Sequence, residues 1–434
     1  MWTTLEKIVI KGGSPLKGEV HISAAKNAVL PIVAATILCD EPVILENVPQ
    51  ISDITFCLKI LRSMGAEVKL INKNRVMFDT RSITNPKVPY EMATKMRASS
   101  YFLGALLGRF HEAHVAMPGG CDLGDRPIDQ HLKAFRALGA TDTLESGEVS
   151  LYADELIGSL VYFDMNSVGA TINAMLAAVK AESLTVLENC AKEPHIVDVA
   201  NFLNSMGADI MGAGTDTIKI RGVKKLKGIE YSVIPDQIEA GTFMAAAAIT
   251  GGDVLVKNVI PKHLESITQA LRKIGVTVDE FDDYVRVHVE GELKAAKLKT
   301  MPHPGFPTDM QPQISTLLTL ANGASVVTEA IFDNRFAYAK ELRRMGADIT
   351  VSGKAVLING VDKLKGAPVN ASDLRAGAAL VIAGLAADGT TEIGNIHFIQ
   401  RGYENIVEKF KELGADIKYS HYPDLGEGEI KREA

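Results

Sequence analysis

The feature that most constrains the fold of this chain is a sixfold internal repeat. Apolar residues at helical spacing run up to a glycine, which is followed each time by alanine or valine. Successive copies of this glycine are about 70 residues apart, so the repeats fill nearly the whole chain. A chain that repeats one pattern in this way is expected to fold as copies of one supersecondary unit. The repeated glycines are Gly65, Gly139, Gly207, Gly275, Gly346 and Gly414.

Each repeat predicts the same order of helices and strands. The stretch before the glycine is amphipathic, as Ile54, Leu58 and Leu61 illustrate, and the glycine is typical of a helix C-terminus. Short β-type segments such as 347–351 follow it. Ahead of the amphipathic stretch lies a second helical segment, rich in Ala, Gly and Leu, without a polar face. The unit therefore reads buried helix, strand, amphipathic helix, strand, strand.

The second helical segment of each unit is predicted to lie in the protein interior, because a helix that is apolar all round needs cover on every side. The six predicted interior helices are 28–38, 99–107, 170–179, 241–249, 313–320 and 376–385.

The length of 434 residues exceeds what one hydrophobic core supports, so we expect an α/β protein of two domains with three units each. The predicted N-terminal domain is 23–231. The predicted C-terminal domain is 232–434 together with 1–22, whose strand completes a sheet there. The chain would then cross between the domains near Ser23 and near Ser232, and a double connection of this kind favours hinge closure of a cleft.

Composition excludes several classes of partner. The net charge is −7 and no dense Lys/Arg run occurs, which argues against nucleic-acid binding. No apolar stretch approaches the roughly 20 residues of a membrane span. The four cysteines lack the spacing of a metal or redox site. We therefore expect a cytoplasmic protein that binds small molecules, with neither a nucleic-acid nor a membrane partner.

Unusual polar residues gather at the starts of the predicted interior helices. Equivalent positions of repeated units share one rim, so six helix N-termini, with Lys26, Arg97 and Arg375, are predicted to converge on the cleft and bind phosphates and carboxylates. A cation at a helix N-terminus opposes the helix dipole and so indicates an anion nearby. The aspartates at these starts have the alternative role of helix caps. For Asp309, neighbouring Thr308 could be the cap instead. The aspartates are Asp236, Asp309 and Asp373.

The segment 117–131 departs most from the repeat, because it inserts a glycine-rich loop between a strand and its amphipathic helix. Cys121 stands in this loop between glycine and aspartate, and the sequence leaves open whether it is an incidental or a reactive thiol. The other cysteines, Cys39, Cys57 and Cys190, have apolar neighbours and are predicted to be inert core residues. His131 is interpreted as a structural histidine.

Several short motifs occur in order along the whole chain. They include Lys26-Asn27, Met96-Arg-Ala-Ser99, Pro118-Gly-Gly-Cys121, Gly124-Asp-Arg-Pro-Ile-Asp129, Ser167-Val-Gly169, Phe306-Pro-Thr-Asp-Met-Gln311 and Asp373-Leu-Arg375. Together they resemble the family of UDP-N-acetylglucosamine enolpyruvyl transferases. The resemblance implies two pseudo-threefold domains with helices inside and sheets outside, the inside-out barrel of enolpyruvyl transferases. It implies phosphoenolpyruvate and UDP-N-acetylglucosamine as substrates of the first committed step of peptidoglycan synthesis, without metal or redox cofactor.

The resemblance also implies roles for individual residues. Asp309 is the expected base for the sugar 3-hydroxyl, and Cys121 is the expected acid that protonates the methylene carbon and gives a tetrahedral ketal. Phosphoenolpyruvate is expected at Lys26, Arg126 and Arg401. The sugar is expected at Asn27, Arg97, Asp309 and Ile331, and the uridine side at Arg126, Pro127, Ile128, Asp129 and Gln130. Further substrate contacts are expected from Ser167, Val168, Gly169, Arg335, Asp373 and Arg375.

Two departures from the family pattern concern turnover and nucleotide binding. Met165 and Asn166 stand where many members carry a lysine, and Asp122 and Asp125 replace small residues in the cysteine loop. Two other functions stay open. One is enolpyruvyl transfer to shikimate 3-phosphate, by a sister enzyme that lacks the Pro-Gly-Gly-Cys loop. The other is a catalytically retired paralogue that binds the sugar nucleotide.

Overall fold

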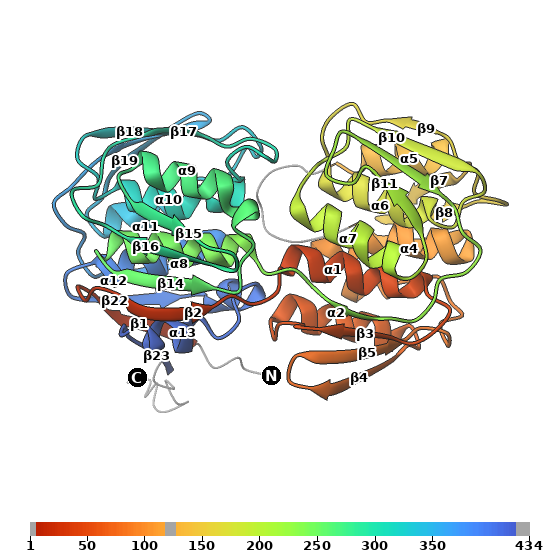
Figure 1. The fold of residues 1–434 in the computed structure, drawn as a ribbon, viewed down its shortest axis with the longest axis horizontal. Coiled ribbons are helices and arrows are strands. Elements are labelled where there is room, and N and C mark those ends of the chain that lie inside the picture. The colour runs from red at the N-terminus through yellow and green to blue at the C-terminus, as the bar shows by residue number, and fades with distance from the viewer. Residues whose placement is uncertain (1–5, 118–126, 422–434) are drawn as a thin grey trace, which may run out of the picture.

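The computed structural model describes residues 6–117 and 127–421 and consists of two lobes lying side by side (Figure 1). Buried apolar residues form two separate clusters. One cluster runs from Ala24 to Val233. The other joins Ile8–Ile22 to residues 238–417. We propose that these clusters are the cores of the two domains predicted from the sequence, and we call them the N-terminal lobe (23–231) and the C-terminal lobe (1–22 and 232–434).

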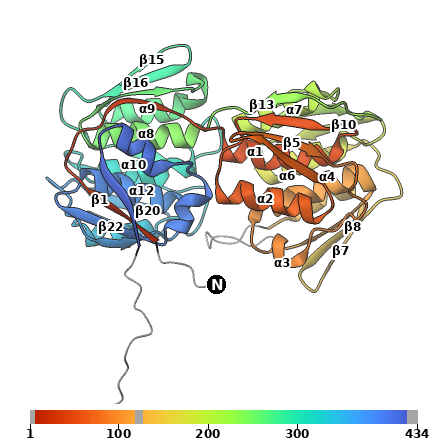
Figure 2. The same cartoon turned by 90° about the horizontal axis from the view of Figure 1, so that it is seen from below.

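Six interior helices occur where the repeat predicts them, three in each lobe (Figures 1 and 2). Their small side chains allow close packing: a Cβ at Gly104 would meet the backbone oxygen of Asn173, on the neighbouring helix, at 2.4 Å. The Gly104 N–H donates to the Asn173 side chain at 2.8 Å. The interior helices are α1 (Lys26–Ala35), α4 (Tyr101–Phe110), α6 (Val168–Ala178), α8 (Gln237–Ile249), α10 (Gln311–Leu318) and α12 (Leu374–Ala386).

The amphipathic helices end at the repeated glycines, as predicted. Each of the six glycines has positive φ, a conformation that glycine adopts without a steric penalty. In the first unit the Ala66 N–H donates to Leu61 O and the Gly65 N–H to Arg62 O, both at 3.0 Å, which is the Schellman pattern. These helices are α2 (Ser52–Ser63), α5 (Asp129–Ala137), α7 (Pro194–Ser205), α9 (Glu265–Lys273), α11 (Tyr338–Arg344) and α13 (Ile406–Glu412).

Within residues 6–117 and 127–421 the strands form six small sheets, three in each lobe. In spatial order, those of the N-terminal lobe are β13 (Glu230–Ser232), β3 (Val43–Glu46), β5 (Arg75–Asp79), β4 (Glu67–Asn72); β6 (Glu112–Ala116), β8 (Glu148–Tyr152), β7 (Thr141–Glu145); and β11 (Asp209–Met211), β12 (Thr217–Arg221), β10 (Leu184–Glu188), β9 (Leu160–Tyr162). Those of the C-terminal lobe are β15 (Thr277–Glu280), β16 (Tyr284–His288), β14 (Asp253–Lys257), β2 (Lys17–His21); β17 (Lys297–Lys299), β18 (Ala324–Thr328), β20 (Ala355–Asn359), β19 (Asp348–Ser352); and β21 (Pro368–Asn370), β22 (Thr390–Gly394), β1 (Glu6–Lys11), β23 (Asp416–His421).

The N-terminal segment supplies strands to two sheets of the C-terminal lobe. Strand β1 lies between β22 and β23 and is antiparallel to both, while β2 pairs in parallel with β14. The predicted unit has three strands, but five of the sheets contain a fourth, short strand that pairs in parallel at one edge. Most of these edge strands span only three residues, too few for an alternating pattern to reveal.

The two lobes are connected by two antiparallel chain segments that hydrogen-bond to each other. The Ala25 N–H donates to Ile234 O and the Asp236 N–H to Ser23 O, both at 2.8 Å. The Asp236 carboxylate caps α8 through the N–H groups of Ile238 and Glu239, and it also accepts from the Lys26 N–H at 3.2 Å. One carboxylate at the connection thus fixes the first turns of a helix in each lobe.

Candidate active site

A cavity of about 570 Å³ lies between the lobes, and residues at the N-terminal ends of all six interior helices line it. Helix N-termini carry positive partial charge, so this arrangement favours anionic ligands. The residues that line it from these ends are Lys26 and Asn27; Arg97, Ser100 and Tyr101; Val168 and Gly169; Gln237 and Ile238; Thr308 and Asp309; and Leu374 and Arg375.

The structure brings together around this cavity every predicted site residue that it describes. Two predicted residues, Cys121 and Arg126, lie outside the described residues, as do Asp122 and Asp125. The predicted residues in the cavity wall are Lys26, Asn27, Arg97, Pro127, Ile128, Asp129, Gln130, Ser167, Val168, Gly169, Asp309, Ile331, Arg335, Asp373, Arg375 and Arg401.

Lys26 and Arg401 share one carboxylate, that of Asp53. The Lys26 Nζ lies 2.7 Å from Asp53 Oδ2. Arg401 approaches from the other lobe, with its Nε 2.9 Å from Asp53 Oδ1 and its second contact at 3.3 Å. All three side chains are largely buried. The anion that the sequence predicts near Lys26 is therefore present, and it is a side chain of the protein.

Burial and charge act in opposite directions on the pKa values of this cluster. Burial lowers the pKa of Lys26 below its usual value, against the opposing effect of Asp53. Burial disfavours ionisation of Asp53, but the positive charges of Lys26 and Arg401 outweigh it, so the pKa of Asp53 lies below its usual value. The carboxylate is therefore ionised at neutral pH and balances part of the positive charge in the cavity.

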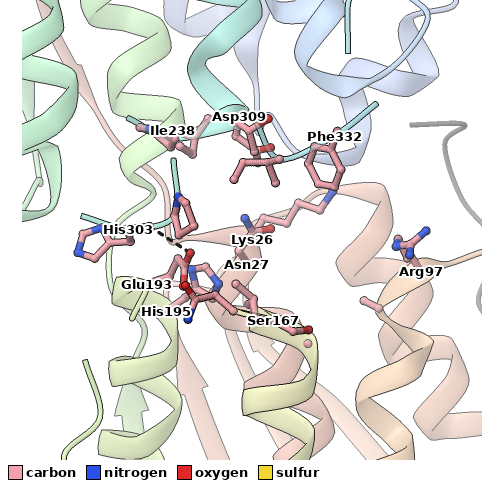
Figure 3. A pocket seen from close by; sticks show the side chains of 18 of the residues that line it. Lys26, Asn27, Arg97, Ser167, Glu193, His195, Ile238, His303, Asp309 and Phe332 are labelled. Atoms are coloured by element: carbon pink, nitrogen blue, oxygen red, sulfur yellow. Dashed lines mark hydrogen bonds between the residues drawn. The ribbon is translucent and has the colours of Figure 1, made fainter. Parts of the chain in front are cut away.

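Asp309 lies in the cavity wall on the side of the C-terminal lobe (Figure 3), and two arginines contact it. Arg335 donates to Asp309 Oδ1 at 2.8 Å, and Arg375 donates to Oδ2 at 3.2 and 3.0 Å. Burial disfavours the charged form of Asp309, but the two arginines hold its pKa well below the usual range. A carboxylate in these contacts is a weak base, so it can accept a proton efficiently only when an arginine contact loosens.

Arg375 is held from behind by a buried hydroxyl group. Its Nη1 donates to the Tyr403 hydroxyl at 3.1 Å, and that hydroxyl lies 2.9 Å from the Thr242 hydroxyl. Burial raises the pKa of Tyr403, so the phenol stays neutral at physiological pH. The arginine is thereby fixed in position beside Asp309.

Glu329 organises the segment that carries Ile331 and the turn that carries Asp309. Its Oε1 accepts from the Thr300 hydroxyl at 2.8 Å and from the Ile331 N–H at 2.8 Å. Its Oε2 accepts from the Thr308 hydroxyl at 2.9 Å. The suggestion that Thr308 caps its helix was wrong, because this hydroxyl donates to Glu329 and the turn has no side-chain cap.

The three aspartates at helix starts have different roles. Asp236 and Asp373 are caps, and Asp373 accepts from the N–H groups of Arg375 and Ala376 at 2.9 and 3.0 Å. Asp309 caps nothing among the described residues and faces the arginines instead. Asp309 and Asp373 both line the cavity, but of the three carboxylates only that of Asp309 is free of a capping role among the described residues.

The nucleotide side of the predicted site is partly occupied by internal hydrogen bonds. The Gln130 Oε1 accepts from the Asp164 N–H at 2.9 Å, and its Nε2 donates to Asp129 at 2.8 Å. Asn166, at one departure from the family pattern, donates to backbone oxygens of Asn189 and Cys190. Gln130 and Asn166 therefore shape this wall of the cavity.

The three cysteines of the described residues agree with their predicted role as inert core residues, since Cys39, Cys57 and Cys190 are buried. The expectation that His131 is a satisfied structural histidine was wrong, because its buried Nδ1 has no hydrogen-bond partner among the described residues and its side chain lines the cavity. Burial lowers the pKa of His131 to about 4, so its ring is neutral at physiological pH. Its ring contacts Gly169, where a Cβ would lie 2.7 Å from Nε2.

Several residues of the cavity wall were missed from the sequence. Asp53 stands in the first turn of an amphipathic helix, where acidic residues are ordinary, and Glu193 precedes the proline that opens α7. Acidic residues are common at the starts of helices, so nothing in the sequence indicated that these two residues lie in the cavity wall. The other missed polar residues include Ser100, Tyr101, His195, Gln237, His263, Ser266 and His303.

No helix in residues 6–117 and 127–421 has the length and apolar character needed to cross a membrane. No group of three or more His, Cys, Asp or Glu side chains in the same residues is arranged to hold a metal ion.

Comparison with known proteins identifies relatives over almost the whole chain. The sequence model of the EPSP synthase family, 3-phosphoshikimate 1-carboxyvinyltransferase, matches residues 10–410. UDP-N-acetylglucosamine 1-carboxyvinyltransferase 3 of Caldanaerobacter subterraneus subsp. tengcongensis is 56% identical, covering 95% of this chain and 99% of that protein. UDP-N-acetylglucosamine 1-carboxyvinyltransferase 2 of Clostridium acetobutylicum is 55% identical with the same coverage.

Solved structures share the fold. The enolpyruvyl transferase NikO from Streptomyces tendae superposes with a TM-score of 0.87 at 27% identity, over 97% of this chain and all of NikO. EPSP synthase from Acinetobacter baumannii superposes with a TM-score of 0.72 at 22% identity, over 96% of this chain and all of that protein. The chain therefore has the enolpyruvyl transferase fold and belongs to the EPSP synthase family and, within it, to the enzymes named UDP-N-acetylglucosamine 1-carboxyvinyltransferases.

Proposed function

We propose that this protein transfers the enolpyruvyl group of phosphoenolpyruvate to the 3-hydroxyl of UDP-N-acetylglucosamine and releases phosphate. The observation that carries the proposal is the cavity where six helix N-termini meet Lys26, Arg335, Arg375 and Arg401, in a chain 55–56% identical to enzymes of that name. The reaction would serve as the first committed step of peptidoglycan synthesis, and we assign it to the cytoplasm.

Phosphoenolpyruvate is assigned to the cluster of Lys26 and Arg401, with Arg126 as a third ligand. Because both described cations contact the Asp53 carboxylate, their charged groups are close enough to bind one small anion together. An arginine presents paired donors that match a carboxylate or a phosphate. Binding of the substrate would exchange part of the internal ion pair for contacts to the ligand.

The amino sugar is assigned to the space between Asn27 and Asp309, with Arg97 and Ile331 as further contacts. Asp309 would remove the proton from the 3-hydroxyl while the oxygen attacks C2 of phosphoenolpyruvate. Because Arg335 and Arg375 hold the Asp309 pKa low, we expect the bound sugar to displace an arginine contact and so strengthen the base.

Cys121 would donate its proton to the methylene carbon in the same addition, giving a tetrahedral ketal that carries the phosphate. In the elimination, the Cys121 thiolate takes back a proton from the new methyl group as the C2–O bond to phosphate breaks, and the proton held by Asp309 passes to the departing phosphate. The products are the enolpyruvyl ether and inorganic phosphate, and both side chains return to their starting states.

Positioning in the cavity is expected to contribute more than either proton-transfer group. Orienting two bound reactants can remove up to roughly 7–11 kcal/mol of barrier. General acid or base help is worth about 10²–10⁴ in rate. We therefore expect the fixed cations and helix N-termini, which position the reactants, to account for most of the lowering of the reaction barrier.

Mass spectrometry of the sugar-nucleotide product tests this proposal. The purified protein, incubated with phosphoenolpyruvate and UDP-N-acetylglucosamine, should convert the sugar nucleotide into its enolpyruvyl ether. Unchanged sugar nucleotide, despite measurable binding, would favour the retired-paralogue alternative. An enolpyruvyl ether formed only from shikimate 3-phosphate would favour the sister reaction of the same family.

A further inference from the structure

Two side-chain oxygens at one end of the cavity lack hydrogen-bond donors. They are Glu193 Oε2 and Gln237 Oε1, both buried and both without a partner among the residues that the structure describes. Glu193 precedes α7 in the N-terminal lobe and Gln237 begins α8 in the C-terminal lobe, so the two lobes contribute one acceptor each. Because an unpaired buried oxygen is unfavourable, these atoms require donors from water or a ligand.

One oxygen of Glu193 contacts the other lobe. Its Oε1 accepts a long hydrogen bond of 3.5 Å from the His303 backbone N–H, and Figure 3 shows this contact. Glu193 also lines the cavity, and its Oε2 has no donor among the described residues.

Other polar residues line the cavity near these two oxygens. A small adjoining hollow is lined by Gln237 together with Asn27, His195 and His263. Figure 3 places Glu193 and His195 on the same side of the cavity as Asn27. The polar residues named for this end carry amide, imidazole and carboxylate groups.

This chemistry suits a neutral ligand with hydroxyl or amide N–H donors and disfavours a phosphate, because a carboxylate and an amide oxygen accept hydrogen bonds. Asn27, which belongs to the same hollow, is the residue that we assign to the amino sugar. The acceptor sugar offers ring hydroxyls and an acetamido N–H. The diphosphate and phosphoenolpyruvate offer acceptors almost exclusively.

We propose that Glu193 and Gln237 form a subsite that reads the hydroxyl and acetamido donors of the acceptor sugar and so contributes to acceptor specificity. This inference rests on the proposed function, since it assumes UDP-N-acetylglucosamine in the cavity. The two lobes then share recognition of the sugar, because each supplies one of the oxygens.

Isothermal titration with UDP-N-acetylglucosamine and with UDP alone tests the subsite. Glu193→Gln and Gln237→Met keep side-chain size while removing an acceptor or its charge. Each substitution should raise the dissociation constant of UDP-N-acetylglucosamine about tenfold, which is the effect of one lost hydrogen bond. The dissociation constant of UDP should stay within about twofold of the wild-type value. Exposed Glu182→Gln, in the same lobe as Glu193, is the matched control and should change neither.

The subsite proposal would be overturned if the variants bound UDP and UDP-N-acetylglucosamine more weakly by the same factor, or if the affinity for neither ligand changed. A melting temperature within about 2 °C of wild type shows that a variant is folded before its affinity is read. A wild-type protein that does not bind UDP-N-acetylglucosamine would overturn the proposed function and the subsite together. A wild type that turns over normally alongside unaffected variants would overturn the subsite alone.

Discussion

Asp53 in the N-terminal lobe and Arg401 in the C-terminal lobe form a two-point ion pair across the cavity, with contacts of 2.9 and 3.3 Å. The same carboxylate lies 2.7 Å from Lys26. The pair therefore connects the lobes and keeps two cations of the cavity close together. In the proposed mechanism these are the cations that bind phosphoenolpyruvate, so Asp53 acts as a positioning residue for them.

Asp53→Asn should raise KM for phosphoenolpyruvate about tenfold or more, while KM for UDP-N-acetylglucosamine changes by less than about threefold. The reason is that an amide holds Lys26 and Arg401 less firmly than a charged acceptor does. Steady-state kinetics with each substrate varied in turn measure the difference. Asp40→Asn is the control for loss of one negative charge. Asp40 forms an ion pair with Lys180 and is the more exposed of these two side chains. A lower KM for phosphoenolpyruvate would contradict the positioning role and indicate simple competition.

Asp309→Asn should reduce kcat by about 10²–10⁴, because the amide cannot accept the 3-hydroxyl proton. Since Arg335 and Arg375 hold the Asp309 pKa well below its usual range, this group stays ionised above pH 5 in the free enzyme. The profile of kcat/KM between pH 5 and 7 should therefore show no acid limb from Asp309. A variant that keeps more than about a tenth of wild-type kcat would exclude Asp309 as the base.

Asp198→Asn should change how stability depends on pH. Burial raises the Asp198 pKa to about 6, against the lowering effect of hydrogen bonds from Tyr231 and Ile234 near the lobe connection. An acid with a raised folded-state pKa stabilises the fold below its unfolded pKa, near 4, and this contribution is lost as pH rises through 6. Between pH 4 and 7, the free energy of unfolding of the wild type should therefore fall by about 3 kcal/mol relative to that of the variant.

Urea unfolding of both proteins across this pH range measures that difference. A constant difference in unfolding free energy from pH 4 to 7 would mean that Asp198 titrates normally.

Gly104→Ala should destabilise the N-terminal lobe by about 1–3 kcal/mol, because the added Cβ would meet the Asn173 backbone oxygen at 2.4 Å and push two interior helices apart. Denaturant unfolding checks this value. Gly291→Ala, where a Cβ meets no atom within 4 Å, is the matched control and should stay within about 0.5 kcal/mol of wild type. Equal stability of the two variants would contradict the close packing of α4 and α6.

Much of the fold could be predicted because each unit repeats strong local signals. Gly65 and its five equivalents require positive φ after a helix, and the alanine-rich segments have no face suited to water. The fourth strands, such as Glu230–Ser232, could not be predicted. A strand of three residues carries too little pattern, and its position depends on a partner strand far away in sequence.

The candidate site could be predicted only in part, because helix starts reveal position but not contacts. Lys26 and Arg375 drew attention since cations oppose the helix dipole at that end. Asp309 comes from a different unit than Arg375, and although Asp53 shares the first unit with Lys26, nothing in the sequence shows that it reaches Lys26 and Arg401 together. Glu193 and Gln237 resemble ordinary helix-start residues, and only the structure shows that both line the cavity and that each has a buried oxygen without a donor among the described residues.

The most direct test of the proposed function is phosphate release from phosphoenolpyruvate by the purified full-length protein. UDP-N-acetylglucosamine and shikimate 3-phosphate would serve as alternative acceptors, with Cys121→Ala measured in parallel. The account predicts phosphate release only with the sugar nucleotide, abolished or severely reduced in the variant. Release with shikimate 3-phosphate alone, or with neither acceptor despite sugar-nucleotide binding, would contradict it.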